Sequence, residues 1–154
     1  MKKDSVLSPL PVEVDYDPIS ESLIDLPAII ALAHHPKAGA IVLFSGEVRN
    51  HSKDKKVTHL IYEAYVPMAR KMILETIEKA KSKFDLHQAI CIHRVGQVGI
   101  CEAAIVVVTA SSHREEAYAA NRFIIEKVKH EAPIWKNEFF EDGTSEWGGN
   151  CSCH

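Results

Sequence analysis

Residues 88–111, QAICIHRVGQVGICEAAIVVVTAS, decide the fold class of this chain. The stretch contains two apolar runs of strand length, Gln88–Val95 and Ala103–Ser111. Short apolar runs with β-branched residues, bounded by turn residues, are typical of buried strands. The region between them, Gly96–Glu102, has the composition of a turn and could hold a short strand of its own. We therefore predict two strands separated by this turn region.

The sequence that follows predicts a helix and a further strand. Ser112 is a good N-cap residue, and Glu115 stands three residues later, which is the spacing of a capping box. Pro133 cannot continue a helix and is predicted to end this one. Ile134–Phe140 is then predicted to form the last strand.

The sequence before residue 88 supplies the remaining elements. Apolar residues recur there at helical spacing in two segments, and β-branched and aromatic residues mark two strands. These elements are a helix at 22–35 that Pro36 closes, a strand at 38–48, a mobile polar loop at 50–56, a strand at 57–64 and a helix at 67–84.

The order of these elements contains no clean alternation of strand and helix. It therefore predicts an α+β fold with about three helices and a mixed, largely antiparallel sheet. We expect a single domain at 21–147. Residues 1–20, rich in proline and acidic residues, are predicted to form an extended, loosely held arm or edge strand, and residues 148–154 a flexible tail.

The composition is that of an ordinary folded domain of 154 residues, with 46% apolar and 25% charged residues. Lys and Arg total 18 against 21 Asp and Glu, so no global positive field exists to bind nucleic acid or an anionic membrane. No stretch approaches the ~18 apolar residues of a membrane span, and no signal-peptide core is seen. We therefore expect a cytoplasmic chain whose four cysteines are free thiols. Because the net charge is not positive, any anion site must be formed by a local group of cations.

Two neighbouring cations, His113 and Arg114, open the third predicted helix. Cations at this end oppose the helix dipole at a cost of ~0.3 to 1 kcal/mol, whereas the free N–H groups there attract anions. A bound phosphate would reconcile the two effects. The alternative is that Glu115 and Glu116 neutralise the local charge and that Arg114 simply lies on the surface. The residues alone leave both interpretations open.

Two lysines, Lys129 and Lys136, stand on either side of Pro133. A lysine near a helix C-terminus is favoured by the dipole, so Lys129 taken alone is more typical of a structural role. Lys136 follows an apolar, rigid segment that could hold its amine near other positive groups in a partly dry cleft. Such a setting lowers the pKa of an amine toward use as a nucleophile or proton carrier. The sequence does not show whether the two lysines converge.

Other polar residues give weaker signals. Arg49 ends a predicted strand where a loop begins, a common place for a binding residue, although such an arginine is usually just solvated. His93 and Arg94 lie inside a strand pattern and are interpreted as a satisfied structural pair. Cys151–His154 offers three soft ligands in four residues, but a tetrahedral zinc site normally draws on two separated pairs. We predict no metal site and no bound cofactor.

Five segments, in order along the chain, resemble the MoaE family, the large catalytic subunit of molybdopterin synthase. They read GAIVLFSGEVRN at 39–50, VTHLIYEAYVPMA at 57–69, IHRVGQVGICEAAIVVV at 92–108, SSHREEAY at 111–118 and KVKHEAPIWKNE at 127–138. The HRxxA element and the two lysines seven residues apart around PIWK make a chance likeness a poor explanation.

The resemblance implies an α/β-hammerhead-like fold and a homodimer of large subunits flanked by two small ubiquitin-like sulfur carriers. It implies that the carrier's C-terminal thiocarboxylate enters the large subunit and that two sulfurs pass to cyclic pyranopterin monophosphate, forming the dithiolene of molybdopterin in molybdenum cofactor biosynthesis. Lys129 and Lys136 match the family's active-site lysines, while Arg49, His113 and Arg114 match its substrate-pocket cations. Both reactants are anions, so these five groups would hold them together.

Two positions depart from the family pattern. Asn137 stands where PIWKKE is common, and we interpret this as a lost surface charge. Gly148–Cys151 stands where a bacterial-type tail often carries an arginine, which argues against a phosphate contact there. Two other functions remain open: a non-catalytic module that docks a ubiquitin-like tail, and a different phosphate-ester enzyme using the same cations. The isolated chain, with no evident sulfur donor, is expected to make no molybdopterin.

Overall fold

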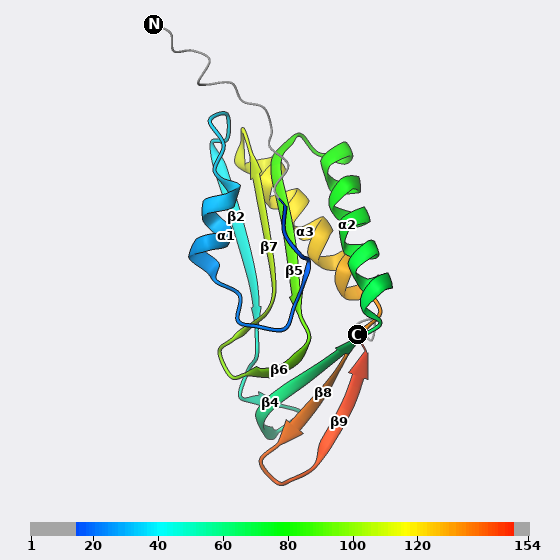
Figure 1. Ribbon diagram of the computed structural model, residues 1–154. Coiled ribbons are helices and arrows are strands. Elements are labelled where there is room, and N and C mark those ends of the chain that lie inside the picture. The colour runs from blue at the N-terminus through cyan, green and yellow to red at the C-terminus, as the bar shows by residue number, and fades with distance from the viewer. Residues whose placement is uncertain (1–14, 150–154) are drawn as a thin grey trace, which may run out of the picture.

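A computed structural model describes residues 15–149, so predictions for residues 1–14 and 150–154 lie outside the described residues (Figure 1). Between these limits the chain forms three helices and two sheets. The elements are β1 (Ile19–Ser20), α1 (Leu26–Ala33), β2 (Ala40–Glu47), β3 (His51–Ser52), β4 (Lys55–Ala64), α2 (Val66–Lys83), β5 (Leu86–Arg94), β6 (Gly96–Gly99), β7 (Ala103–Ser111), α3 (Arg114–Glu131), β8 (Ile134–Phe140) and β9 (Ser145–Gly149).

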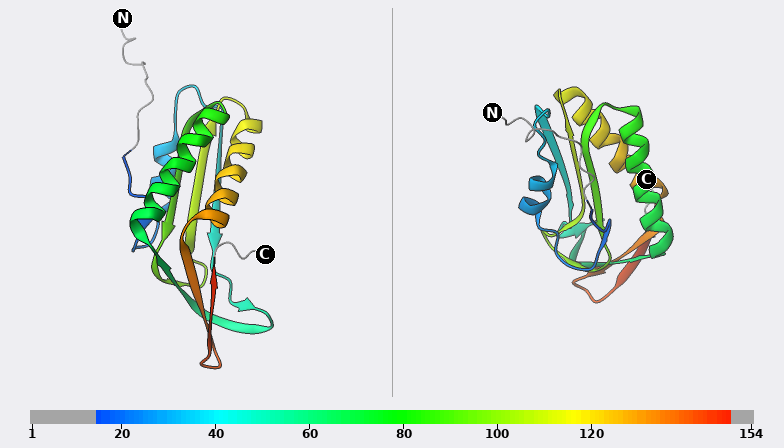
Figure 2. Two further views of the ribbon diagram at one scale, coloured as in Figure 1. Left: turned by 90° about the vertical axis from the view of Figure 1, so that its right-hand side faces the viewer. Right: turned by 45° about the horizontal axis from the view of Figure 1, so that its top comes forward.

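The first sheet has the strand order β1-β5-β7-β2, with β1 parallel to β5 and the other pairs antiparallel. Helices α2 and α3 cover one face and α1 covers the other (Figures 1 and 2). Alternate residues of β5 and β7 therefore enter two separate cores. Ile90 and Val106 pack on the α1 side, whereas Cys91 and Val107 pack on the side of α2 and α3. Burial on both faces explains why these strands read as continuous apolar runs.

The second sheet is antiparallel, with the order β3-β4-β8-β9 and with β6 paired to β4. It lies beyond one end of the first sheet (Figure 1). The prediction of a mobile loop at 50–56 is wrong. Lys53 and Asp54 both have positive φ angles, 52° and 67°, which is the backbone of a two-residue hairpin turn matching the twist of its strands. The described part of the chain thus has the predicted α+β class.

Helix starts differ from the prediction because of side-chain contacts. Helix α1 begins later than predicted because the Asp25 carboxylate accepts a hydrogen bond from the Ala28 N–H at 3.1 Å and caps it there. The N-cap of α3 is His113, with no side-chain capping bond, so the predicted capping box at Ser112 is wrong. The Ser112 hydroxyl instead contacts His87 and the Lys37 carbonyl.

Residues 15–20 are attached to the first sheet. Cys91 N–H donates to the Tyr16 hydroxyl at 3.1 Å, Ile19 is buried beside β5, and Arg70 pairs with Asp17 at 3.1 Å. The expectation of an edge strand is confirmed for β1, and the expectation of a loosely held arm is wrong for this part.

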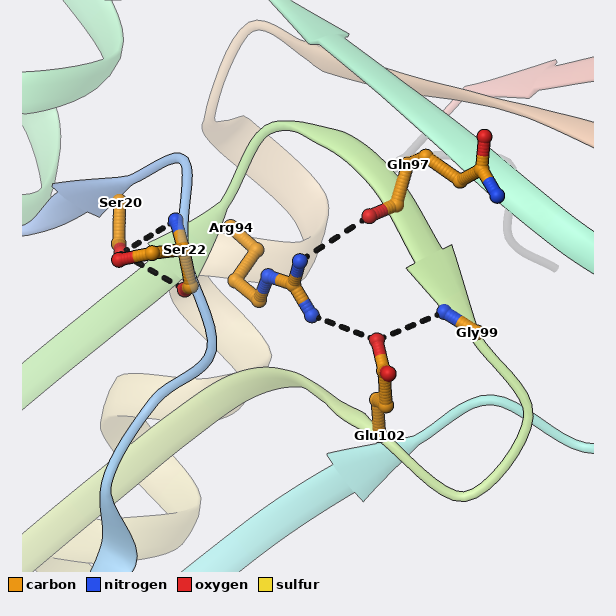
Figure 3. Close-up of polar contacts among 6 residues, drawn as sticks. All are labelled: Ser20, Ser22, Arg94, Gln97, Gly99 and Glu102. Carbon is orange, nitrogen blue, oxygen red and sulfur yellow. Dashed lines mark hydrogen bonds and ion pairs between the residues drawn. The ribbon is translucent and has the colours of Figure 1, made fainter.

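The turn region around β6 is fixed by a buried arginine, Arg94. Its guanidinium donates to the Glu102 carboxylate at 2.9 Å and to the Gln97 carbonyl at 3.0 Å, while the same Glu102 oxygen accepts from Gly99 N–H (Figure 3). The Gly99 hydrogen bond, with Arg94, lowers the pKa of Glu102 and keeps it ionised. The predicted short strand is confirmed as β6.

Throughout residues 15–149 no helix is long and apolar enough to cross a membrane.

Candidate functional site

A pocket of about 190 Å³ opens where the two sheets meet the C-terminal end of α3. Three of the five predicted site residues line it. Arg49 follows the end of β2, Lys129 lies in the last turn of α3, and Lys136 lies on β8 opposite Tyr62 of β4. Arg49 and Lys129 are exposed and Lys136 is half-buried, so the three cations form the solvent-facing rim of the pocket.

The two lysines have different surroundings. Lys136 Nζ lies 4.0 Å from a Glu138 carboxylate oxygen. The pKa of Lys129 is lowered, first because neighbouring protein atoms displace water from its amine and then because Lys136 is close. Lys129 nevertheless keeps contact with solvent at the pocket mouth.

Two buried rings, His93 and Tyr62, line the pocket together with two acidic residues, Glu47 and Glu138. His93, only 2% exposed, has Nδ1 at 2.8 Å from the Arg94 carbonyl oxygen, so Nδ1 carries the hydrogen and Nε2 is an acceptor. Burial lowers the pKa of His93 to about 4, and the nearby Lys129 charge acts in the same direction. The Tyr62 ring meets the His93 ring edge-on at 5.0 Å, and burial raises the pKa of Tyr62 to about 12. Three cations and two acidic residues therefore surround two neutral polar rings.

Residues 93 and 94 were interpreted as a structural pair, and both are buried. Arg94 has that role through Glu102 and Gln97, although its Nε finds no partner within residues 15–149. His93 also lines the pocket, a role that was not predicted from the sequence. The available signal was an ionisable ring in a run of otherwise apolar strand residues.

The other two predicted site residues, His113 and Arg114, lie at the opposite end of α3. Fifteen residues separate Arg114 from Lys129, a span of about 22 Å along a helix. Both side chains are exposed and neither lines the pocket. One chain therefore brings together Arg49, Lys129 and Lys136, and leaves the remaining two cations elsewhere.

Comparison with known proteins identifies the family. The family model described as MoaE protein matches residues 19–131. The chain belongs to the MoaE family. The molybdopterin synthase catalytic subunit of Thermoplasma volcanium is 42% identical to this MoaE chain over 132 residues, covering 86% of the chain and 96% of the relative. That of Staphylococcus epidermidis is 40% identical over 114 residues, covering 74% and 75%.

Solved structures agree with the fold of this MoaE chain. Molybdopterin synthase from Staphylococcus aureus superposes with a TM-score of 0.82 at 34% identity, covering 89% of this chain and 99% of the other. A complex of subunits 1 and 2 of the molybdopterin-converting factor from Helicobacter pylori gives 0.70 at 25% identity, covering 84% and 88%. The predicted fold class is thereby confirmed.

Two further positions can be placed in this MoaE chain. Asn137 is only 9% exposed and its Oδ1 has no partner among the described residues, so the prediction of a lost surface charge is wrong about its location. Cys91 is buried and Cys101 is an exposed free thiol, whereas Cys151 and Cys153 lie outside residues 15–149. Within that range no three His, Cys, Asp or Glu side chains are grouped to hold a metal ion.

Proposed function

We propose that this MoaE protein is a cytoplasmic sulfurtransferase, the catalytic subunit of a molybdopterin synthase. It transfers sulfur from the C-terminal thiocarboxylate of a small ubiquitin-like carrier to cyclic pyranopterin monophosphate. The observation that carries the proposal is the pocket of a MoaE fold that gathers Arg49, Lys129 and Lys136 beside the neutral rings of His93 and Tyr62. Such a site suits two anionic reactants, because fixed cations offset both their mutual repulsion and the loss of water around them.

The two lysines have separate roles in this reaction. Lys136, held near Glu138, is the fixed cation that orients a carboxylate or phosphate. Lys129 has the lowered pKa and therefore reaches its neutral form more easily. Attack of sulfur on the pterin and release of the carrier carboxylate both require proton transfers, which an amine of this kind can perform. His93, neutral and fixed in one tautomer, does not compete for that proton near neutral pH.

The complete site needs more than one chain. The pocket, about 190 Å³, is smaller than the ~300–1,000 Å³ usual for ligand sites, and it opens to solvent. His113 and Arg114 are about 22 Å along α3 from Lys129, so they can join a pocket only from a second copy of the chain. We therefore propose a homodimer flanked by two carrier subunits. The complex named for the Helicobacter pylori relative supports a small-subunit partner.

Reconstitution tests the function directly. The protein is mixed with thiocarboxylated carrier and cyclic pyranopterin monophosphate, and molybdopterin is measured. The matched control is the same carrier with an ordinary C-terminal carboxylate. We expect product only with the thiocarboxylate. Carrier binding without pterin conversion would indicate a docking module, and pterin turnover without a carrier would indicate a different phosphate-ester enzyme.

A further inference from the structure

The segment that leads into α3 is held by elements distant from it in the sequence. Gly39 N–H donates to the Ser111 carbonyl at 2.9 Å, just before β2 begins. A Cβ atom at Gly39 would stand 2.5 Å from the Ser112 carbonyl oxygen, so only glycine permits this approach. The backbone that precedes His113 is therefore packed closely against the loop that follows α1.

Side chains extend this contact through a pair of histidines. Ser112 Oγ lies 2.9 Å from His87 Nε2 and 3.3 Å from the Lys37 carbonyl oxygen. Lys37 N–H donates to His35 Nδ1 at 3.0 Å. The rings of His35 and His87 are stacked, with centroids 4.6 Å apart and planes 10° from parallel. Four residues from three segments thus form one connected group.

The direction of each hydrogen bond follows from the chemistry of the atoms. The Lys37 carbonyl can only accept, so the Ser112 hydroxyl gives it its hydrogen, and Ser112 Oγ then accepts the hydrogen of His87 Nε2. His35 Nδ1 receives the Lys37 N–H, which leaves that ring nitrogen without a hydrogen of its own. Each of these hydrogen bonds therefore has a fixed donor and a fixed acceptor. While both rings are neutral, the group has a single hydrogen-bonding arrangement.

His113 and Arg114 directly follow Ser112, a member of this group. Within residues 15–149 no hydrogen bond or ion pair orients either side chain, and His113 caps α3 without using its ring. Their place in space is therefore set by the backbone that carries them, which is held by the contacts of residues 111–113 and by the packing of α3 on the first sheet. Ser112 is the residue of that backbone whose side chain contacts both the α1 end loop and the start of β5.

We propose that Ser112, His87 and His35 form a positioning cluster that sets His113 and Arg114 for binding the phosphate of the pterin substrate. The inference rests on the proposed function, which gives those two cations their substrate role. It adds three residues that do not line the pocket and are not among the matched family cations. Loosening the cluster will weaken pterin binding while the chemistry at the other end of α3 continues.

The test uses the reconstituted full-length enzyme and separates KM for cyclic pyranopterin monophosphate from kcat. Ser112→Ala removes the hydroxyl, and His87→Phe keeps a stacked ring but removes the N–H donor. Each variant should raise KM by about three- to tenfold, the effect of losing one hydrogen bond, with kcat changed less than about twofold. Ser112→Thr, which keeps the hydroxyl, should restore the parent KM, and His34→Ala, a neighbouring exposed histidine outside the cluster, should leave it unchanged.

Combined variants show whether the cluster acts through the two substrate cations. If Ser112 acts only by positioning His113 and Arg114, Ser112→Ala should add little to the rise in KM caused by His113→Ala together with Arg114→Ala. Fully additive effects, or an unchanged KM in both Ser112→Ala and His87→Phe, would overturn the inference while leaving the function intact. Failure of the parent protein to make molybdopterin would overturn the function, and the inference with it.

Discussion

The two ends of α3 carry cations in opposite settings. At its C-terminal end Lys129 shares a pocket with Lys136 and His93, and its pKa is lowered by the surrounding protein and by the second lysine. At its N-terminal end His113 and Arg114 extend into solvent. The helix dipole favours a cation at the first of these ends and disfavours one at the second.

This difference indicates two kinds of chemistry on one rigid element. A partly desolvated amine beside another cation changes its protonation state easily, which suits proton transfer. An arginine in water keeps its charge and suits anion binding, especially where free N–H groups of a helix start point the same way. Mutations at each end can therefore be sorted by whether they change the rate of chemistry, the binding of anions or the stability of the fold.

The largest effect is expected for Lys129 at the pocket end. Lys129→Ala should slow single-turnover sulfur transfer by about a thousandfold, or ~4 kcal/mol, because it removes the proposed proton carrier. Lys129→Arg should be almost as slow, since a guanidinium keeps its proton at working pH. Lys127→Ala is the matched control, because Lys127 pairs with Glu131 at 2.9 Å on the same helix and does not line the pocket. A fast Lys129→Arg enzyme would reduce the role of Lys129 to electrostatics.

The next effect concerns His93 and the loss of folding stability at acidic pH. Its pKa is about 4 in the folded protein and about 6.5 when unfolded, so the unfolded chain binds more protons between these values. Because the His93 ring stays neutral in the folded protein, its contribution to the free energy of unfolding has its full value above pH 6.5. That contribution falls as the pH drops toward 4, by about 3 kcal/mol in all.

Asparagine can keep the hydrogen bond to the Arg94 carbonyl but cannot take up the proton. His93→Asn should therefore be less stable than the parent at pH 7, and the gap should shrink by about 3 kcal/mol at pH 4. Denaturant unfolding at several pH values measures this difference in the free energy of unfolding. The control is His130→Asn, at an exposed position in the last turn of α3. Parallel curves for parent and His93→Asn would show that His93 takes up its proton at the same pH in the folded and unfolded states, which would contradict the lowered pKa.

Local sequence patterns predicted the elements whose bounds are set locally. Ala103–Ser111 and Ile134–Phe140 were predicted with the bounds found for β7 and β8, because continuous apolar content defines the first and Pro133 sets the start of the second. The capping box at Ser112 failed for the opposite reason. Its hydroxyl is engaged by His87 and by the Lys37 carbonyl, 25 and 75 residues away, and no local pattern reveals that competition.

The site could be predicted only in part for the same reason. Arg49, Lys129 and Lys136 were found as single residues, and tertiary packing is what gathers them around one pocket. His93 was missed as a pocket residue because a strand pattern gives its spacing but not the space beside its ring. The separation of His113 and Arg114 from the pocket follows simply from helix length, about 22 Å, once both groups are placed on one helix.

The smallest effect is expected at the N-terminal end of α3. Glu115 lies in the first turn of α3 and directly follows Arg114 in the sequence. Its carboxylate interacts favourably with the helix dipole at this end. Glu115→Gln should reduce the free energy of unfolding by only ~0.3 to 1 kcal/mol, and the loss should fade in 1 M salt, since exposed charges are screened. Glu126→Gln, in an exposed mid-helix pair with Arg122, controls for loss of any surface carboxylate. The same Glu115→Gln change should lower KM for the pterin slightly, because it removes a negative charge beside the proposed anion site. A larger, salt-independent loss of stability would mean that Glu115 acts through a specific contact, and the contrast between the two ends would then not rest on the dipole.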